Sequence, residues 1–293
     1  MADVLQQVVS GLASGGIYAS LALAIVLIYR ATQVINFAQG EMAMFTTFVA
    51  WSLMNHMSYW PAFALTLLIA FAGGALLELV VIRPVQNAPV LTVVIVTIGL
   101  LIGINGLARR IWGSEPRVLD SPFSTDAKRI GGVAFSIQDI GTIGVSLGIV
   151  VLLWLFFKYT KVGLGLRAAA LNPDASRLVG VRVSLMLALG WGLAAVLGAV
   201  AGMMAAPPLG SFDQNLMAPV LIYAFAAAIL GGIDSPLGAV VGGLALGVIV
   251  NLVGTYVDFV GPELRLTTAL TLILVVLLVR PAGLFGRQAA RRV

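Results

Sequence analysis

The residues best suited to chemistry form a short polar segment between two long apolar runs. This segment contains Asn36, Gln39, Gly40 and Glu41. A carboxylate and two amides are costly at membrane depth, and such groups usually mark a solute pathway, a buried partner or a break in a helix. The segment therefore predicts a broken helix near 34–41, with Gly40 and its polar neighbours interrupting the span and a second half-helix starting near Asn36.

Two interpretations of this polar segment stay open. In the first, the second half-helix presents free N–H groups to a polar solute, and Glu41 in its first turn complements the helix dipole. Asn36, Gln39, Gly40 and Glu41 are then pathway or gate residues. In the second, Asn36, Gln39 and Glu41 satisfy one another and the neighbouring spans, and their role is structural.

The composition places the whole chain in a membrane. Of 293 residues, 60% are hydrophobic and only 10% are charged, and the mean hydropathy is +1.05. A soluble domain carries roughly a quarter charged residues, whereas a membrane helix needs about 20 apolar residues. We therefore predict an all-α, polytopic membrane helix bundle that forms one transmembrane domain over 1–293, with spans at 8–29, 36–54, 61–82, 90–111, 139–158, 184–206, 217–232, 236–257 and 266–280.

The number of spans has an alternative. The break at Gly231–Pro236 allows 217–232 and 236–257 to be two half-helices, which gives eight crossings instead of nine. Two loops stand out on opposite sides of the membrane, at 112–138 and at 159–183. The stretch 130–137 in the first loop carries a weak signal for a hairpin strand.

The basic residues predict which side of the membrane is which. Eleven of the 17 Lys and Arg residues fall on one side of the alternating spans, and six fall on the other. The positive-inside rule then makes 159–183 cytoplasmic and 112–138 external, with the C-terminus inside and the N-terminus outside. It also explains the net charge of +5 without nucleic acid. The larger group is Arg30, Arg83, Lys158, Lys161, Arg167, Arg177, Arg182, Arg280, Arg287, Arg291 and Arg292.

Residues for catalysis are scarce. The chain has no cysteine and one histidine, His56, in a polar stretch that resembles a loop. A phosphate-binding loop needs glycines before a lysine, and none of Lys128, Lys158 and Lys161 follows a glycine. We therefore expect no catalytic residue, no metal site and no cofactor in this chain, and any ATP hydrolysis must occur on another protein.

The loop 159–183 contains the signals of a short helix. Asn172 suits the N-cap and Pro173 the first helical position. Asp174 then lies at the positive end of the dipole, and Gly180 is a natural C-terminal stop. A helix of about two turns is unstable alone and must pack on something. Its docking partner is either a protein or the lipid headgroups.

The same loop resembles a known family. Residues 167–181, Arg-Ala-x-Ala-x-Asn-Pro-Asp-Ala-x-Arg-Leu-x-Gly-Val, resemble the coupling loop of Liv-type permeases, the inner-membrane subunits of branched-chain amino acid ABC importers. Gln39 departs from the family, which more often has histidine there, and the departure removes a titrating group. Other stretches resemble the family in the same order along the chain, at 11–30, 34–42, 97–100 with 112–116, 224–232 and 280–286.

The resemblance implies a division of labour. It implies a permease subunit of an ATP-driven, binding-protein-dependent importer for branched-chain or other small neutral amino acids in a bacterial inner membrane. The implied partners are two cytoplasmic ATPase subunits that hold ATP and Mg, a second related permease, an external solute-binding protein and membrane lipid. The residues it implies for ATPase coupling are Arg167, Ala168, Ala170, Asn172, Pro173, Asp174, Arg177 and Gly180.

Two other functions remain open. The same type of importer can carry urea, short amides or small organic acids, and specificity then lies in the binding protein. An ion-coupled secondary transporter needs a committed intramembrane charge, for which Glu41 is the strong candidate. Dependence of uptake on ATP or on an ion gradient separates these classes.

Overall fold

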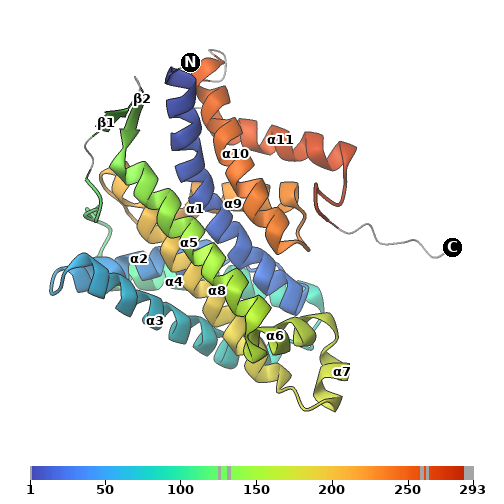
Figure 1. Cartoon of the computed structure of the whole chain (residues 1–293). Coiled ribbons are helices and arrows are strands. Elements are labelled where there is room, and N and C mark those ends of the chain that lie inside the picture. The colour runs from blue at the N-terminus through green and yellow to red at the C-terminus, as the bar shows by residue number, and fades with distance from the viewer. Residues whose placement is uncertain (1, 125–126, 131–132, 258–260, 262–263, 287–293) are drawn as a thin grey trace.

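The computed structural model describes residues 2–124, 127–130, 133–257, 261 and 264–286. Helices make up most of this part of the chain (Figure 1). The helices are α1 (Ala2–Thr32), α2 (Gln39–Met54), α3 (Tyr59–Leu77), α4 (Val90–Trp112), α5 (Ile137–Tyr159), α6 (Lys161–Leu171), α7 (Pro173–Leu178), α8 (Val183–Ala205), α9 (Met217–Gly231), α10 (Pro236–Tyr256) and α11 (Arg265–Val279).

Short elements complete the chain path. The π-helical turn η1 (Glu78–Ile82) and the 3-10 turn η2 (Arg83–Val85) extend α3, and the 3-10 turn η3 (Pro207–Leu209) follows α8. The antiparallel strands β1 (Ala127–Ile130) and β2 (Val133–Ser136) form a hairpin. The weak strand signal at 130–137 therefore corresponds to a real hairpin, which begins three residues earlier than predicted.

The helices match the predicted class of membrane helix bundle. Within the described residues, six helical stretches are long and apolar enough to cross a membrane, judged by length and composition. They correspond to α1, α3 with its extension, α4, α5, α8 with its extension, and α10. Helices α2, α9 and α11 have 16, 15 and 15 residues. The choice between eight and nine crossings therefore stays a prediction.

The two ends of the bundle carry different elements. Ser10 near the start of α1 donates a hydrogen bond of 2.8 Å to Asp139 at the start of α5, and the hairpin lies at the same end (Figure 1). Helices α6 and α7 lie at the opposite end of α1 and α5 (Figure 1). The loops 112–138 and 159–183 thus lie at opposite ends of the bundle, and the side of the membrane that each one faces stays a prediction. The predicted sorting also used Arg287, Arg291 and Arg292, which lie outside the described residues.

Helix α1 lies at the centre of the bundle and packs closely along α10. A Cβ added to Gly243 would lie 2.5 Å from the Cα of Ala19, and one added to Gly247 would collide with the backbone of Gly15. Small residues allow such close helix approach in membranes, where the lipid supplies no hydrophobic driving force. Farther along the pair, Asn251 donates a 2.7 Å hydrogen bond to the carbonyl of Gln7. The other helices that pack on this antiparallel pair include α5, α8, α9 and α11.

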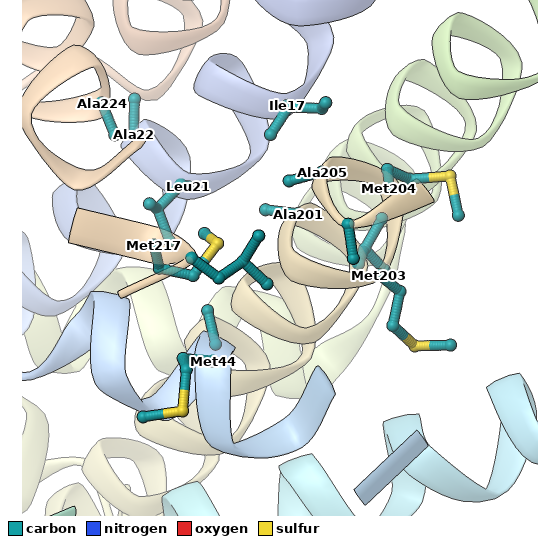
Figure 2. Close-up of a cluster of buried hydrophobic side chains, with 14 of the residues drawn as sticks. Ile17, Leu21, Ala22, Met44, Ala201, Met203, Met204, Ala205, Met217 and Ala224 are labelled. Atoms are coloured by element: carbon teal, nitrogen blue, oxygen red, sulfur yellow. The ribbon is translucent and has the colours of Figure 1, made fainter. Parts of the chain in front are cut away.

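The core between α1, α2, α8 and α9 is rich in methionine and alanine. Figure 2 shows Leu21, Met44, Ala201 and Met217 in one cluster of buried side chains. All four side chains are buried. Methionine fills irregular gaps between helices because its side chain is flexible, so this core fixes the position of α2 against α8 and α9.

Candidate functional site

The predicted break occurs between α1 and α2. Helix α1 ends at Thr32, and Gln33 has a φ of 57°, the left-handed conformation. Asn36 and Gln39 follow, and both are completely buried. The broken helix is confirmed, but the second helix begins at Gln39 and not near Asn36. Gly40 does not interrupt the span, because it lies in the first turn of α2.

The two buried amides satisfy each other and the backbone. The Asn36 Oδ1 accepts a 3.0 Å hydrogen bond from the N–H of Ala38, and the Asn36 Nδ2 donates to the Gln39 Oε1 at 3.2 Å. The Gln39 Nε2 donates to the carbonyl of Ala194 on α8 at 3.0 Å. Asn36 therefore closes an Asx turn in front of α2, and Gln39 ties α2 to α8. Buried polar groups with partners of this kind specify packing.

Gly40 allows a close approach by α9. A Cβ at this position would lie 3.2 Å from the Cδ2 of Leu221. The ring of Phe37 lies 5.7 Å from that of Phe225, also on α9. The polar segment is therefore enclosed by α8 on one side and by α9 on the other.

Glu41 points to a different set of partners. Its Oε2 accepts a 3.0 Å hydrogen bond from the Nδ2 of Asn105 on α4. The same Nδ2 lies 3.2 Å from the carbonyl of Gln214, and the Asn105 Oδ1 accepts a 2.9 Å bond from the Nε of Arg109. Glu41 is half-buried and Arg109 is exposed. The structure thus links a half-buried carboxylate to a surface cation through one amide.

Sequence analysis missed Asn105 and Gln214 as members of this site. The available signal for Asn105 was an isolated amide inside the apolar run of α4. Gln214 lies in the segment between η3 and α9, and its Nε2 also donates a 2.5 Å bond to the carbonyl of Gly113. Nothing in the spacing along the chain connects Glu41 to positions 64 and 173 residues away. Their meeting depends on how α2 packs on α4.

Several side-chain and backbone contacts fix the end of α4 that follows Asn105. The indole N–H of Trp112 donates to the Ser52 Oγ at 2.8 Å. The guanidinium of Arg117 lies 4.8 Å from the centre of the Trp51 ring, and its backbone pairs with that of Phe212. Helix α2, the end of α4 and the segment before α9 are therefore joined near the 112–138 loop.

The predicted short helix in 159–183 is present as α7. The Asn172 Oδ1 caps it by accepting a 3.0 Å bond from the N–H of Ala175, and Pro173 is its first residue. Asp174 and Arg177 form a 2.9 Å ion pair on its exposed surface. Gly180 has a φ of +84°, which favours glycine at the helix end.

The other predicted coupling residues lie in a separate helix. Arg167, Ala168 and Ala170 belong to α6, a helix that the sequence analysis did not predict. The Thr160 hydroxyl caps α6 by accepting from the N–H of Gly163 at 2.9 Å. Arg167 and Ala170 line a cleft against the bundle, so the predicted set is divided between two surfaces.

The tip of the α6–α7 segment is apolar and exposed. Leu178 is 89% exposed, Val179 is 79% exposed and Leu171 is 69% exposed. Helix α7 contacts only α6 and the start of α8 among the described elements with substantial packing. Large apolar side chains gathered at a protruding tip indicate a surface that another molecule covers.

One family model covers almost the whole chain. Residues 7–279 match the family described as the permease component of the branched-chain amino acid transport system. This chain belongs to that family. The permease is 30% identical to the high-affinity branched-chain amino acid transport system permease protein BraD of Pseudomonas aeruginosa, over 99% of this chain and 98% of the relative. It is 29% identical to LivH of Escherichia coli, over 99% of this chain and 97% of the relative.

The permease also has a distant likeness to a solved structure. The chain from PsaBC of Streptococcus pneumoniae in complex with Fab has a TM-score of 0.49 and 15% identity, covering 95% of the permease and 92% of that chain. The family assignment comes from the sequence matches alone. It makes this chain a multi-pass transport permease and not an enzyme, as predicted.

Proposed function

We propose that this chain is a transmembrane subunit of an ATP-driven, binding-protein-dependent importer for branched-chain or other small neutral amino acids. The observation that carries the proposal is the family match over 7–279. The relatives of nearly equal length are named as branched-chain amino acid permeases, which supports this class of solute. Urea, short amides and small organic acids are the solutes to compare in the same assay.

The exposed tip of the α6–α7 segment is the proposed docking site for an ATPase subunit. Leu178 and Val179 supply an apolar surface, and the capped helix α7 gives it a defined shape. Helix α6 packs on α5 and α8 and links the tip to the bundle. Closure of two ATPase subunits around ATP and Mg would then move α6 and α7 as one unit, and this movement would shift α5 and α8.

The orientation follows from the same segment. Lys158, Lys161, Arg167, Arg177 and Arg182 gather at the α6–α7 end, and cationic loops favour the cytoplasmic side. We therefore propose that the start of α1 and the 112–138 loop face the outside. Leu284 donates to the carbonyl of Leu230 at 2.9 Å, which brings the chain beyond α11 to the cytoplasmic end. The proposed location is the bacterial inner membrane.

Within the polar segment we assign the gate role to Glu41. Asn36, Gln39 and Gly40 hold the start of α2 in place through their contacts with α8 and α9. Glu41 is linked through Asn105 to the exposed Arg109 on the external side. A second related permease facing the sparsely packed helix α4 would complete the solute path, and the external binding protein would dock near Arg109.

The decisive experiment is purification of this chain in mild detergent from its native membrane, with identification of co-purifying proteins by mass spectrometry. Recovery of two ATPases and a second hydrophobic permease, together with uptake in vesicles that requires ATP, would support the importer. Recovery of the chain alone, with uptake driven by a proton or sodium gradient, would contradict it and favour an ion-coupled mechanism at Glu41.

A further inference from the structure

A large apolar cleft lies at the α6–α7 end of the bundle. It has a volume of about 650 Å³ and is formed by α1, α5, α6, α8 and α10. This volume falls within the range of roughly 300–1,000 Å³ that is common for ligand sites. The apolar part of its lining includes Leu23, Leu27, Val151, Trp154, Leu237 and Val240.

The cleft opens on the outer surface of the bundle. Helices α5 and α10 both pack against α1 and lie on opposite sides of it (Figure 1). At the margins, Trp154 of α5 is 50% exposed and Leu237 of α10 is 63% exposed. Because α5 and α10 are long and apolar enough to span the membrane, the opening faces the acyl chains of the bilayer.

Three cations line the cleft together with these apolar groups. They are Arg30 in the last turn of α1, Lys158 in the last turn of α5, and Arg167 on α6. The Lys158 Nζ lies 4.5 Å from the centre of the Trp154 ring. No acidic side chain is among the described residues that line the cleft. Lys158 and Arg167 therefore place positive charge at one end of the apolar groove, where α5 ends.

Charge, and not hydrophobicity, must select the occupant. An acyl chain gains little by moving from the bilayer into the cleft, since lipid tails are as apolar as the leucines that line it. Basic pockets between membrane helices on the cytoplasmic side attract anionic headgroups, and each Lys or Arg near the surface strengthens binding about fivefold. Lys158 and Arg167 therefore favour an anionic over a zwitterionic headgroup.

We propose that this cleft binds an anionic phospholipid. One acyl chain lies between α5 and α10 against α1, and the phosphate lies at Lys158 and Arg167. Since Arg167 and Ala170 belong to α6, the bound lipid would hold α6 against the bundle. The proposal does not depend on which solute the permease carries.

The test measures lipid retention on the purified transporter with all subunits that remain bound to it. After detergent delipidation, the protein is incubated with phosphatidylglycerol or with phosphatidylcholine of the same chain length, and bound lipid is counted by native mass spectrometry. We expect at least tenfold stronger retention of phosphatidylglycerol. Arg167→Gln and Lys158→Gln should each weaken it about fivefold. Lys161→Gln, on α6 but outside the cleft lining, should leave it unchanged.

A second variant tests the acyl-chain position without changing charge. Gly190 lines the cleft from α8, and a Cβ there would meet only the Leu166 Cδ2, at 3.9 Å. Gly190→Leu should therefore enter the cleft without disturbing the backbone, and reduce phosphatidylglycerol retention to the level of phosphatidylcholine. Equal retention of both lipids by the native protein would overturn the proposal. So would native-level retention in both Arg167→Gln and Gly190→Leu, or loss of the difference once a second permease is bound.

Discussion

The α1–α2 break and the α6–α7 segment were both predicted to be functional, yet the structure places them in opposite environments. At the break, Asn36 and Gln39 are completely buried and bonded to each other and to α8. At the other segment, Leu178 and Val179 project from the bundle. A buried amide without a hydrogen-bond partner and a large apolar side chain exposed to water both cost free energy. The two regions remove this cost in different ways. The amides have partners within this chain, whereas the apolar tip needs a partner from outside.

This contrast predicts that the two regions respond differently to substitution. Changes at the break should reduce the stability of the chain, and transport should fall only as folded protein is lost. Changes at the tip should reduce transport and leave the stability of the chain unchanged. Substitution of Glu41 can show which of the two responses applies there, because Glu41 is next to the break but bonds to Asn105 on α4, which in turn contacts the exposed Arg109.

The largest effect is expected for Leu178→Asp. The side chain is 89% exposed, so the folded permease should be unaffected, but a carboxylate in an apolar docking surface would be desolvated without a partner. We expect ATP-driven uptake in vesicles to fall to background, with an unchanged melting temperature of the isolated chain. Leu178→Met, which keeps the apolar surface, is the control. Normal uptake by Leu178→Asp would show that the tip is not the docking site.

The next effect is expected for Gln39→Leu at the break. This change removes the bond to the Ala194 carbonyl and leaves the Asn36 Nδ2 without its amide acceptor. Each unsatisfied buried group costs about 1–3 kcal/mol, so thermal aggregation in detergent should occur at a lower temperature. Uptake per folded molecule should stay near the native value. A loss of uptake with unchanged stability would instead place Gln39 in the solute path.

A smaller effect is expected for Glu41→Gln. Glutamine keeps an acceptor for the Asn105 Nδ2, so stability should stay within about 0.5 kcal/mol of the native protein. The carboxylate charge that faces Arg109 through Asn105 is lost, and uptake should slow severalfold if that charge helps to gate the path. Measured uptake rates and melting temperatures distinguish a gate role of Glu41 from a structural role. Reduced stability with unchanged uptake would group Glu41 with the buried amides.

The smallest effect is expected for Asn172→Ala at the start of α7. Loss of the bond to the Ala175 N–H removes an N-cap, which typically costs about 1 kcal/mol of helix stability. Because α7 packs weakly on the rest of the bundle, we expect faster hydrogen exchange confined to 173–178 and a partial loss of uptake. Asn172→Asp retains the cap and serves as the control. Exchange that is unchanged in α7 would show that ATPase contacts or other groups hold the helix.

Local signals in the sequence were enough to predict much of this protein. The apolar runs and the scarcity of charge predicted the membrane bundle, since each span in lipid must satisfy its backbone hydrogen bonds within its own helix. Asn172, Pro173 and Gly180 predicted the limits of α7, because capping involves residues only a few positions apart. The polar segment likewise predicted a break, although it begins after Thr32 and the next helix starts at Gln39.

Only the tertiary structure decided what these residues contact. Gln39 bonds to Ala194 and Glu41 to Asn105, and no spacing along the chain links either pair. Arg167 also has the sequence context of a docking residue, but the packing of α6 places it in the cleft. The sequence by itself determined the fold class, the capping residues of α7 and the need of the polar segment for hydrogen-bond partners, because these follow from short-range chemistry. The choice of partner required the packing of helices that are far apart in the chain.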